Sequence, residues 1–485
     1  MKAIISLLVT FLCLSAGPTT QAVSPSPDGC YPNFTTAEGC KALQSLTTGA
    51  GNTGIGWYSL SGNSTGSFNT AIGAGALDLN TADNNTAIGV AALLLNTTGI
   101  NNTANGVGTL VFNNTAEENT ATGAFAMYSN TEGDFNTANG AFTLYFNTIG
   151  ERNTALGDSA LYQNTEGNRN TAVGNTALVT NTDGDDNTAI GMAALRSNTH
   201  GQENTATGVD ALSSNTTGIV NTATGSQALA SNTEGTSNTA SGVDALRDTT
   251  TGGGNTANGF QALLHNDTGD YNTAQGLFAL GSLTTGNDNT GLGRSAGTAV
   301  TTADHVICIG ALVSGANVSN SCYIGQIWQQ QGGSQAVYIN SDGKLGALVS
   351  SRRFKDEIKP MEHASEVIYQ LNPVSFRYKP EVEPSRPTSF GLIAEEVENV
   401  HPDLVLRDKE GKPYTVRYDQ VNAMLLNEFL KEHRKNEQQE SRIADQEAKI
   451  ARQEQQIEAL TTGLQKLSAQ LELSKPGSQT VSNDL

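Results

Sequence analysis

Along most of the chain, apolar and polar residues follow one repeating pattern with a fixed period. The pattern is N-T-A-x-G-x-x-A-L-x-x-N-T-x-G-x-x, in which the apolar positions are few and constant. So short and regular a period is typical of a solenoid, not of a globular domain. The numbering of the lead asparagine advances by 17 at every step except the one from Asn69 to Asn85, and the copies begin at Asn52, Asn69, Asn85, Asn102, Asn119, Asn136, Asn153, Asn170, Asn187, Asn204, Asn221, Asn238, Asn255, Asn272 and Asn289.

Each turn of this predicted solenoid has a small inward face. We expect it to consist of the alanines, the leucine and the apolar or Thr residue after the first alanine. The two glycines predict corners with positive φ, and stacked turns would place Asn over Asn, so that side-chain amides bond along the axis. Because such a turn buries little surface alone, we expect three chains to share one core.

The units Asn69-Thr70-Ala71-Ile72-Gly73 and Asn187-Thr188-Ala189-Ile190-Gly191 resemble the head repeats of trimeric autotransporter adhesins. That resemblance implies a left-handed parallel β-roll assembled as a trimer. The adhesin repeat is shorter than the repeat of this chain, so the likeness concerns architecture and not register. A structural shaft, a surface for glycans or other extracellular ligands, and an ice-binding or calcium-binding array all stay open, although the calcium signature G-G-x-G-x-D is missing.

The pattern changes twice beyond the repeat. Between residues 299 and 348 the period breaks into short strands at 306–310, 322–325 and 337–340, the last followed by a tight turn at 341–344, which together predict a β neck. From Ser350 onward the spacing predicts a small α+β domain. Its expected elements are a helix over 361–371, strands at 374–378 and 390–394, a helix over 395–400 and a hairpin of 404–406 with 414–418.

A helix of about fifty residues is expected after Asp419, which we take as its N-cap. Apolar residues recur in it every seven residues, which predicts a coiled coil, and Gln in the two d layers of Gln446 and Gln453 favours three strands. A single amphipathic helix packed on its own domain is the alternative. The a positions are Phe429, Asn436, Ile443, Ile450, Ile457, Leu464 and Leu471, and the d positions are Leu425, Gln439, Gln446, Gln453, Leu460 and Leu467.

Charge divides the chain at the same place. From Ser350 onward there are 19 basic and 23 acidic residues, which leaves 8 and 24 of the totals of 27 and 47 for the part before it. Because residues 1–349 are acidic and contain few cations, nucleic acid is not an expected partner.

Residues 1–22 predict an export signal. Lys2 precedes a mostly apolar run from Ala3 to Ala16, and Thr20-Gln21-Ala22 offers a cleavage pattern of small residues. The run is too short to span a membrane, and no later segment is apolar enough. We therefore expect a secreted or surface protein without a membrane span; a buried core helix is the alternative reading.

The cysteines and histidines indicate no cofactor or metal site. Cys30 with Cys40 and Cys308 with Cys322 would suit two disulfides in an oxidising compartment, and unpaired thiols fit equally well. Their spacing does not resemble a zinc site. The six histidines are scattered, and we assign them no role.

The candidate chemistry lies in Ser350-Ser351-Arg352-Arg353-Phe354-Lys355. A serine hydroxyl needs a base within hydrogen-bond reach to attack a carbonyl, and a lysine can serve when it is neutral. Burial and neighbouring positive charges favour the neutral amine. Taken alone, the six residues could also be a solvated basic loop beside a chance serine.

The segments SSRRFKDEI, FGLIAEEV and VRYDQVNAMLLNEFLKE resemble the intramolecular chaperone auto-processing domain of phage tailspikes and endosialidases, which also occurs in a membrane-tethered animal transcription factor. The resemblance covers Ser350 to about Arg434. It implies a domain that helps a trimeric β-rich shaft assemble and then cuts itself off through a Ser–Lys dyad. By position, Ser350 is the nucleophile, Lys355 is the base, and the cut falls between Val349 and Ser350. Ser351, where the family often has Asp, is a second candidate nucleophile.

Together these features predict a mainly β, trimeric fibre-like or adhesin-like protein. Its C-terminal domain would be a single-turnover self-cleaving peptidase without a substrate in trans, and the other chains of the homotrimer would be its partners. An uncleaved surface adhesin with an inactive assembly domain is the alternative, and a protease acting in trans is a third reading. The expected organisation is a signal peptide at 1–22, a lead-in at 23–51, the repeat β-roll at 52–305, the β neck at 306–349, the auto-processing domain at 350–434, a coiled coil at 435–474 and a tail at 475–485.

Overall fold

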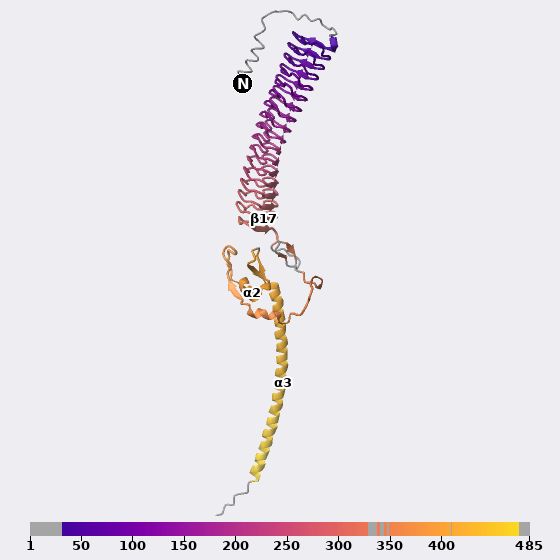
Figure 1. Cartoon of the computed structure of the whole chain (residues 1–485). Helices are drawn as coiled ribbons and strands as arrows, with labels where there is room; N and C mark the ends of the chain where they lie inside the picture. Colours follow the sequence, from indigo (N-terminus) through magenta and orange to yellow (C-terminus); the bar gives the residue numbers. More distant parts are fainter. Residues whose placement is uncertain (1–31, 328–336, 340–343, 347–348, 409, 475–485) are drawn as a thin grey trace, which may run out of the picture. The chain divides into compact units, whose positions relative to one another are not determined.

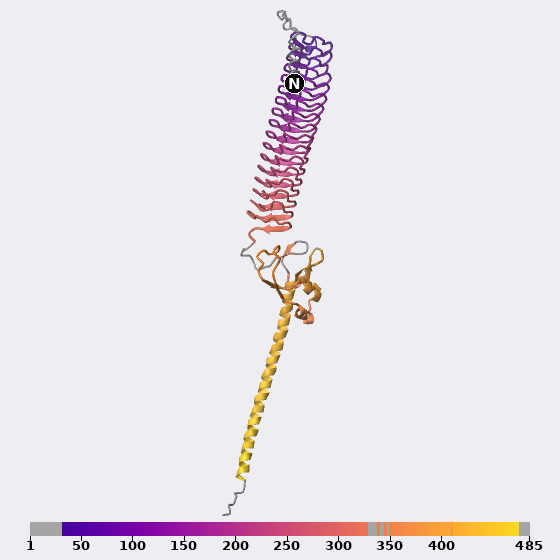
Figure 2. The ribbon, with the colours of Figure 1, turned by 90° about the vertical axis from the view of Figure 1, so that its left-hand side faces the viewer.

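A computed structural model describes residues 32–327, 337–339, 344–346, 349–408 and 410–474. The chain divides into two units, residues 1–331 and 332–485. Figures 1 and 2 show the first unit as a stack of short turns and the second as a small domain continued by the long helix α3. The expected signal peptide, Cys30, the turn at 341–343 and the C-terminal tail lie outside the described residues.

The first unit is a parallel β-solenoid with one short strand in each turn. Its 18 strands form one sheet in which each strand pairs with the next along the chain. After a single 3₁₀ turn, η1 (Pro32–Phe34), the strands are β1 (Thr36–Glu38), β2 (Thr53–Ile55), β3 (Thr70–Ile72), β4 (Thr86–Ile88), β5 (Thr103–Asn105), β6 (Thr120–Thr122), β7 (Thr137–Asn139), β8 (Thr154–Leu156), β9 (Thr171–Val173), β10 (Thr188–Ile190), β11 (Thr205–Thr207), β12 (Thr222–Thr224), β13 (Thr239–Ser241), β14 (Thr256–Asn258), β15 (Thr273–Gln275), β16 (Thr290–Leu292), β17 (Val306–Ile309) and β18 (Ser321–Ile324).

The register follows the sequence period. Thr53 pairs with Thr70 across a step of the usual length, and Thr70 pairs with Thr86 across the one shorter step. The sheet also extends past the copies of the repeat, because β1 stacks before the first of them and β17 and β18 stack after the last. The strands expected at 306–310 and 322–325 therefore continue the solenoid.

The core of each turn is closed within one chain. In the turn of β10, Ala189, Ala194 and Leu195 have no exposed surface. The equivalent residues are also buried in nearly all of the remaining turns. The solenoid core therefore does not need three chains to close it, contrary to our prediction. The residue after the first alanine also does not face inward: the strand pattern exposes its first and third residues and buries only the middle one, so that Ile190 lies outside.

Two columns of asparagines bond along the axis, as predicted. Asn198 Nδ2 donates to Asn181 Oδ1 of the preceding turn at 2.7 Å and to the backbone oxygen of Gly201 at 2.9 Å. Asn187 Nδ2 donates to the same Gly201 oxygen at 2.8 Å, and Asn187 Oδ1 accepts the backbone N–H of Asn204 at 3.1 Å. These amides are fully buried, so their bonds replace those that water would otherwise make.

The second asparagine column is interrupted where Thr249 and Leu283 take its place. The amide oxygens of Asn232 and Asn266, one turn before each substitution, are buried and have no hydrogen-bond partner among the described residues. The missing donor is the amide nitrogen that an asparagine in the next turn would supply. The interruptions thus identify what each member of the column contributes.

The two glycines of the repeat serve different purposes. Gly191 has φ 138°, and a Cβ there would lie 2.4 Å from the backbone oxygen of Gly208 in the next turn. Gly184 has no positive φ, contrary to our prediction, but a Cβ would lie 2.4 Å from the Gly201 oxygen. The other left-handed corners are formed by residues with side chains, such as Ala193 at φ 56° and Leu195 at φ 52°.

Cys308 and Cys322 are free thiols, and so is Cys40. In the pairing of β17 with β18, Cys322 lies opposite Ile307 and Cys308 lies opposite Tyr323. Neighbouring residues of a strand point to opposite faces, so Cys308 is buried while Cys322 is exposed. This offset of one residue excludes the suggested 308–322 disulfide in this structure.

The second unit contains most of the elements that the sequence predicts. In order they are β19 (Tyr338–Ile339), β20 (Leu345–Gly346), η2 (Arg352–Phe354), η3 (Glu362–Gln370), β21 (Val374–Phe376), β22 (Ser389–Gly391), α2 (Ala394–Val400), η4 (Pro402–Leu404), β23 (Val405–Arg407), β24 (Pro413–Val416) and α3 (Tyr418–Leu473). The strands form three antiparallel pairs, β19 with β20, β21 with β22 and β23 with β24. The segment at 361–371 forms a 3₁₀ helix, and the N-cap of α3 is Arg417, so Asp419 lies inside the first turn.

The core of the second unit is small. Its buried apolar residues are Val397, Leu404, Val405, Val416 and Val421, drawn from α2, η4, the β23–β24 pair and the start of α3. From Glu432 onward α3 continues to Leu473 with its side chains exposed. Among the residues that the structure describes, no helix combines the length and apolar character needed to cross a membrane.

Candidate active site

Ser350 and Lys355 are brought together by one tight turn. The 3₁₀ turn η2 is closed by the Phe354 N–H, which donates to the Ser351 oxygen at 3.0 Å, and by the Lys355 N–H, which donates to the Arg352 oxygen at 3.1 Å. The turn reverses the chain within this short segment. The Lys355 side chain can therefore reach back to Ser350.

The Lys355 Nζ donates a hydrogen bond to Ser350 Oγ at 3.3 Å. This distance lies slightly beyond the usual range for such a bond, as is common for catalytic pairs before the reacting complex forms. Ser351 caps the turn with its backbone, and its side chain makes no capping hydrogen bond. The geometry thus pairs Lys355 with Ser350, the first of the two candidate serines.

The pair lies on an open segment. Residues 349–360 are all exposed, including Val349 at 58%. The Arg353 guanidinium lies over the ring of Phe354, 4.6 Å from its centre. The burial that we expected around Lys355 is absent from this segment of the single chain. Among the described residues, only Lys355 donates a side-chain hydrogen bond to Ser350.

A buried polar cluster that sequence reasoning missed joins η3 to α3. The Glu428 carboxylate is 6% exposed and accepts hydrogen bonds from Lys431 Nζ at 2.6 Å, from Tyr369 OH at 2.8 Å and from Ser365 Oγ. Asn427 Nδ2 donates to Ser365 Oγ at 2.7 Å. The hydrogen bonds from Lys431 and Ser365 hold the pKa of Glu428 down to about 2.

This cluster fixes η3, which begins shortly after Lys355, against the first part of α3. A glutamate in a charged helix gives no sign of burial on its own. The sequence signal that this part of α3 packs on its own domain was the dense apolar run around Glu428. This run is too broad for a coiled-coil seam alone, and it consists of Leu425, Leu426, Phe429 and Leu430.

No described part of the chain offers a metal centre, because no group of three or more His, Cys, Asp or Glu residues is arranged to hold an ion. Self-cleavage through a Ser–Lys dyad requires a serine hydroxyl beside a lysine amine. Among the residues that the structure describes, Ser350 and Lys355 are paired in this way.

Comparison with known families gives one match. A peptidase family described as the chaperone of endosialidase matches residues 350–406. The match begins at Ser350 and ends within β23, so it covers part of the second unit and none of the solenoid. No curated protein and no solved structure matches the chain. The family match supports an intramolecular chaperone domain behind the β-solenoid, an arrangement that fits a tailspike-like or fibre-like protein.

Proposed function

We propose that this chain is an exported, trimeric fibre-like protein whose C-terminal domain directs assembly and then cuts itself off between Val349 and Ser350. The observation that carries the proposal is the hydrogen bond between Lys355 Nζ and Ser350 Oγ, at the first residue of the family match. The matched family is named as both a peptidase and a chaperone, which supports a domain with both roles.

In the proposed reaction, Ser350 Oγ attacks the carbonyl carbon of Val349 while neutral Lys355 takes the hydroxyl proton. The carbon–nitrogen bond breaks, the Ser350 nitrogen receives a proton, and an ester links Val349 to Ser350 Oγ. Water then hydrolyses this ester to the Val349 carboxylate and frees the Ser350 hydroxyl. Because nucleophile and target belong to neighbouring residues, proximity supplies much of the rate.

The exposure of the dyad supports a link between cleavage and assembly. A lysine in water is protonated and cannot act as a base. Partner subunits that cover residues 349–360 would remove this water and favour the neutral amine. The cut would then follow trimer formation and would not precede it.

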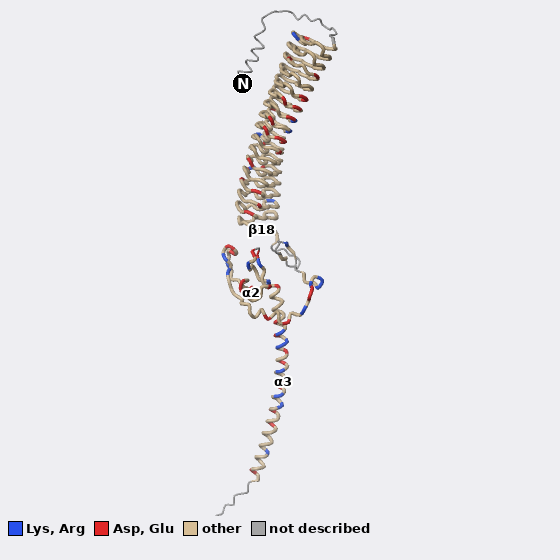
Figure 3. Tube along the Cα trace, in the orientation of Figure 1, with Lys and Arg blue, Asp and Glu red and all other residues tan. Residues whose placement is uncertain are grey.

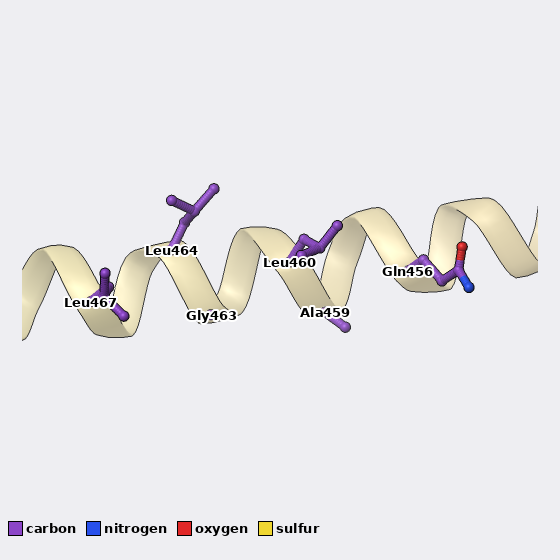
Figure 4. A pocket seen from close by; sticks show the side chains of 6 residues that line it. All are labelled: Gln456, Ala459, Leu460, Gly463, Leu464 and Leu467. Carbon is purple, nitrogen blue, oxygen red and sulfur yellow. The ribbon is translucent and has the colours of Figure 1, made fainter.

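The long helix supports self-association independently of the dyad. The a positions Ile443, Ile450, Ile457, Leu464 and Leu471 are between 52% and 68% exposed. Figure 4 shows Leu460, Leu464 and Leu467 projecting from α3, with Gly463 between them. An apolar seam with a heptad period is buried by other helices of the same kind. We therefore retain the trimeric coiled coil over 435–474 as part of the proposal.

Export rests on the predicted signal peptide at residues 1–22. A glycan or another extracellular ligand for the solenoid is a further part of the proposal. Long parallel β-structures assemble slowly and are prone to misalignment. A chaperone that holds three chains in register and is then removed would leave the finished shaft kinetically trapped.

The test is the intact mass of the purified chain beside its variants. We expect two fragments, divided before Ser350, in the wild type and one uncut chain in Ser350→Ala and in Lys355→Ala. Ser351→Ala and Lys359→Ala are the matched controls, because each removes the same kind of side chain nearby, and both should still be cut. A full-length mass in every sample would contradict self-cleavage and leave the uncleaved adhesin.

A further inference from the structure

One face of the solenoid is free of charge. In each strand from β2 to β16 the first and third residues point outward, and none of these residues is charged. The first residue is Thr in all of these strands. The charged residues of the repeats, most of which are acidic, lie at other positions of the turns (Figure 3). We call the outward residues of β2–β16 the strand face.

An apolar stripe follows one border of the strand face. It is formed by the apolar members of two columns, the third residue of each strand and the residue after the corner glycine. The third residue is apolar in β2–β4, β8–β10 and β16 and is polar but uncharged in the strands between them. More than half of the large apolar side chains exposed between residues 52 and 297 lie in these two columns, including Ile72, Ile88, Leu156, Ile190, Met192 and Leu277. Asp158 and Arg294 are the charged interruptions of the second column.

We infer that the strand face and the apolar stripe form the surface on which the solenoids of identical chains pack side by side. This inference rests on the proposed trimer and adds the surface by which its shafts meet. In a parallel three-fold arrangement the third strand residues lie nearest the axis. The threonine column of one chain then meets the column after the corner glycine of the next.

Charge favours a copy of this chain over another partner. An acidic protein that bound a different macromolecule would present its carboxylates to basic groups. Identical acidic chains repel each other unless their contact is neutral, and the strand face lacks charges of both signs. The shared period points the same way, because rows that recur once per turn match another surface of the same repeat along their whole length.

The size of the face is sufficient for a stable contact. With neighbouring strands about 4.8 Å apart, the strands β2–β16 extend over roughly 70 Å, and the face is roughly 10 Å wide. The resulting area is on the order of 700 Å² for each chain, close to the roughly 800 Å² per partner that is typical of a specific interface.

The experiment compares Ile190→Cys with Ile219→Cys. Both isoleucines are 42% exposed, but Ile190 belongs to the apolar stripe and Ile219 to a loop column. The uncut Ser350→Ala chain is used, with Cys30, Cys40 and Cys322 changed to Ser. A disulfide requires the two Cα atoms to lie within about 7 Å, so it reports direct contact between copies.

We expect mild oxidation to convert most of the Ile190→Cys chain to covalent dimers and to leave Ile219→Cys monomeric on a denaturing gel. A second pair, Ile72→Cys and Ile149→Cys, should repeat this result. Equal cross-linking at both positions, or none at Ile190, would overturn the proposed surface. Light scattering on the same samples separates the two claims: a trimer without cross-links contradicts only the surface, whereas a monomer contradicts the trimer itself.

Discussion

The solenoid and the C-terminal unit differ in how completely a single chain buries its apolar side chains. Nearly all solenoid turns bury their own leucine and bond their asparagine amides to a neighbouring turn. The described part of the C-terminal unit has a core of five buried apolar residues, yet it leaves Phe390, Tyr414 and Phe429 at least 69% exposed. The stability of a stacked array is the sum of the stability of each turn and of its contacts with the neighbouring turns. This stability does not determine how several chains are aligned with one another. In our account the separate C-terminal domain determines this alignment.

The largest effect we expect comes from breaking the apolar seam of α3. Ile450→Asp combined with Ile457→Asp would place charges in two layers of the proposed coiled coil and should abolish the trimer, measured as the mass of the uncut chain by sedimentation equilibrium. Ala448→Asp adds the same charge nearby, outside the a and d positions, and should leave the trimer intact. A trimer that survives the double substitution would show that α3 does not hold the chains together.

Substitution of a corner glycine should cause the second-largest effect, a loss of stability that is confined to the solenoid. In Gly191→Ala the new methyl group would collide with the Gly208 oxygen in a left-handed backbone, so we expect a loss of about 4 kcal/mol, seen as faster hydrogen exchange in the turns on either side. Gly463→Ala is the contrast, because nothing lies within 4 Å of a Cβ there and alanine favours a helix by about 1 kcal/mol. Equal protection in wild type and Gly191→Ala would contradict the close stacking.

The Glu428 cluster gives the C-terminal unit a dependence on acid. The pKa of Glu428 is lowered from 4.5 to about 2, so its contribution to stability is complete above pH 4.5 and is lost as the pH falls toward 2. Urea unfolding followed by helical circular dichroism should show this loss in the uncut chain. Glu428→Gln should reduce this loss of stability at low pH. Glu432→Gln, which changes an exposed carboxylate one turn later, should leave the loss unchanged. A wild-type curve that is flat over this range would exclude this role of the cluster.

The smallest effect should be a gain. Thr249→Asn would restore the amide missing from the second asparagine column and provide a donor to Asn232 Oδ1, which is now buried without a partner. We expect about 1 kcal/mol of added stability. Thr251→Asn, close by on the exposed surface, is the control and should change little. A destabilised Thr249→Asn would mean that the column requires Thr at this turn.

The repeat made the solenoid predictable because each strand is specified by the same residues. Asn, Thr and Ala recur at one spacing, so the parallel register and the asparagine columns followed from the period. The corners did not follow, because Leu195 adopts a left-handed backbone that residue preferences disfavour and that only the surrounding stack imposes.

The candidate site was predictable to the extent that its parts are close in sequence. Ser350 and Lys355 are near neighbours along the chain, and a single turn suffices to pair them. Glu428 and Ser365 are far apart in sequence. Each looks like a surface residue alone, and their burial depends on how η3 packs against α3, which no local pattern records.

The central claim is the cut before Ser350, and the N-terminal sequence of the smaller fragment tests it most directly. Our account predicts that this fragment begins Ser350-Ser351-Arg352 and is absent when Ser350 or Lys355 is changed to Ala. A fragment that begins at Ser351 or elsewhere, or a wild-type chain that stays whole after the trimer has formed, would contradict it.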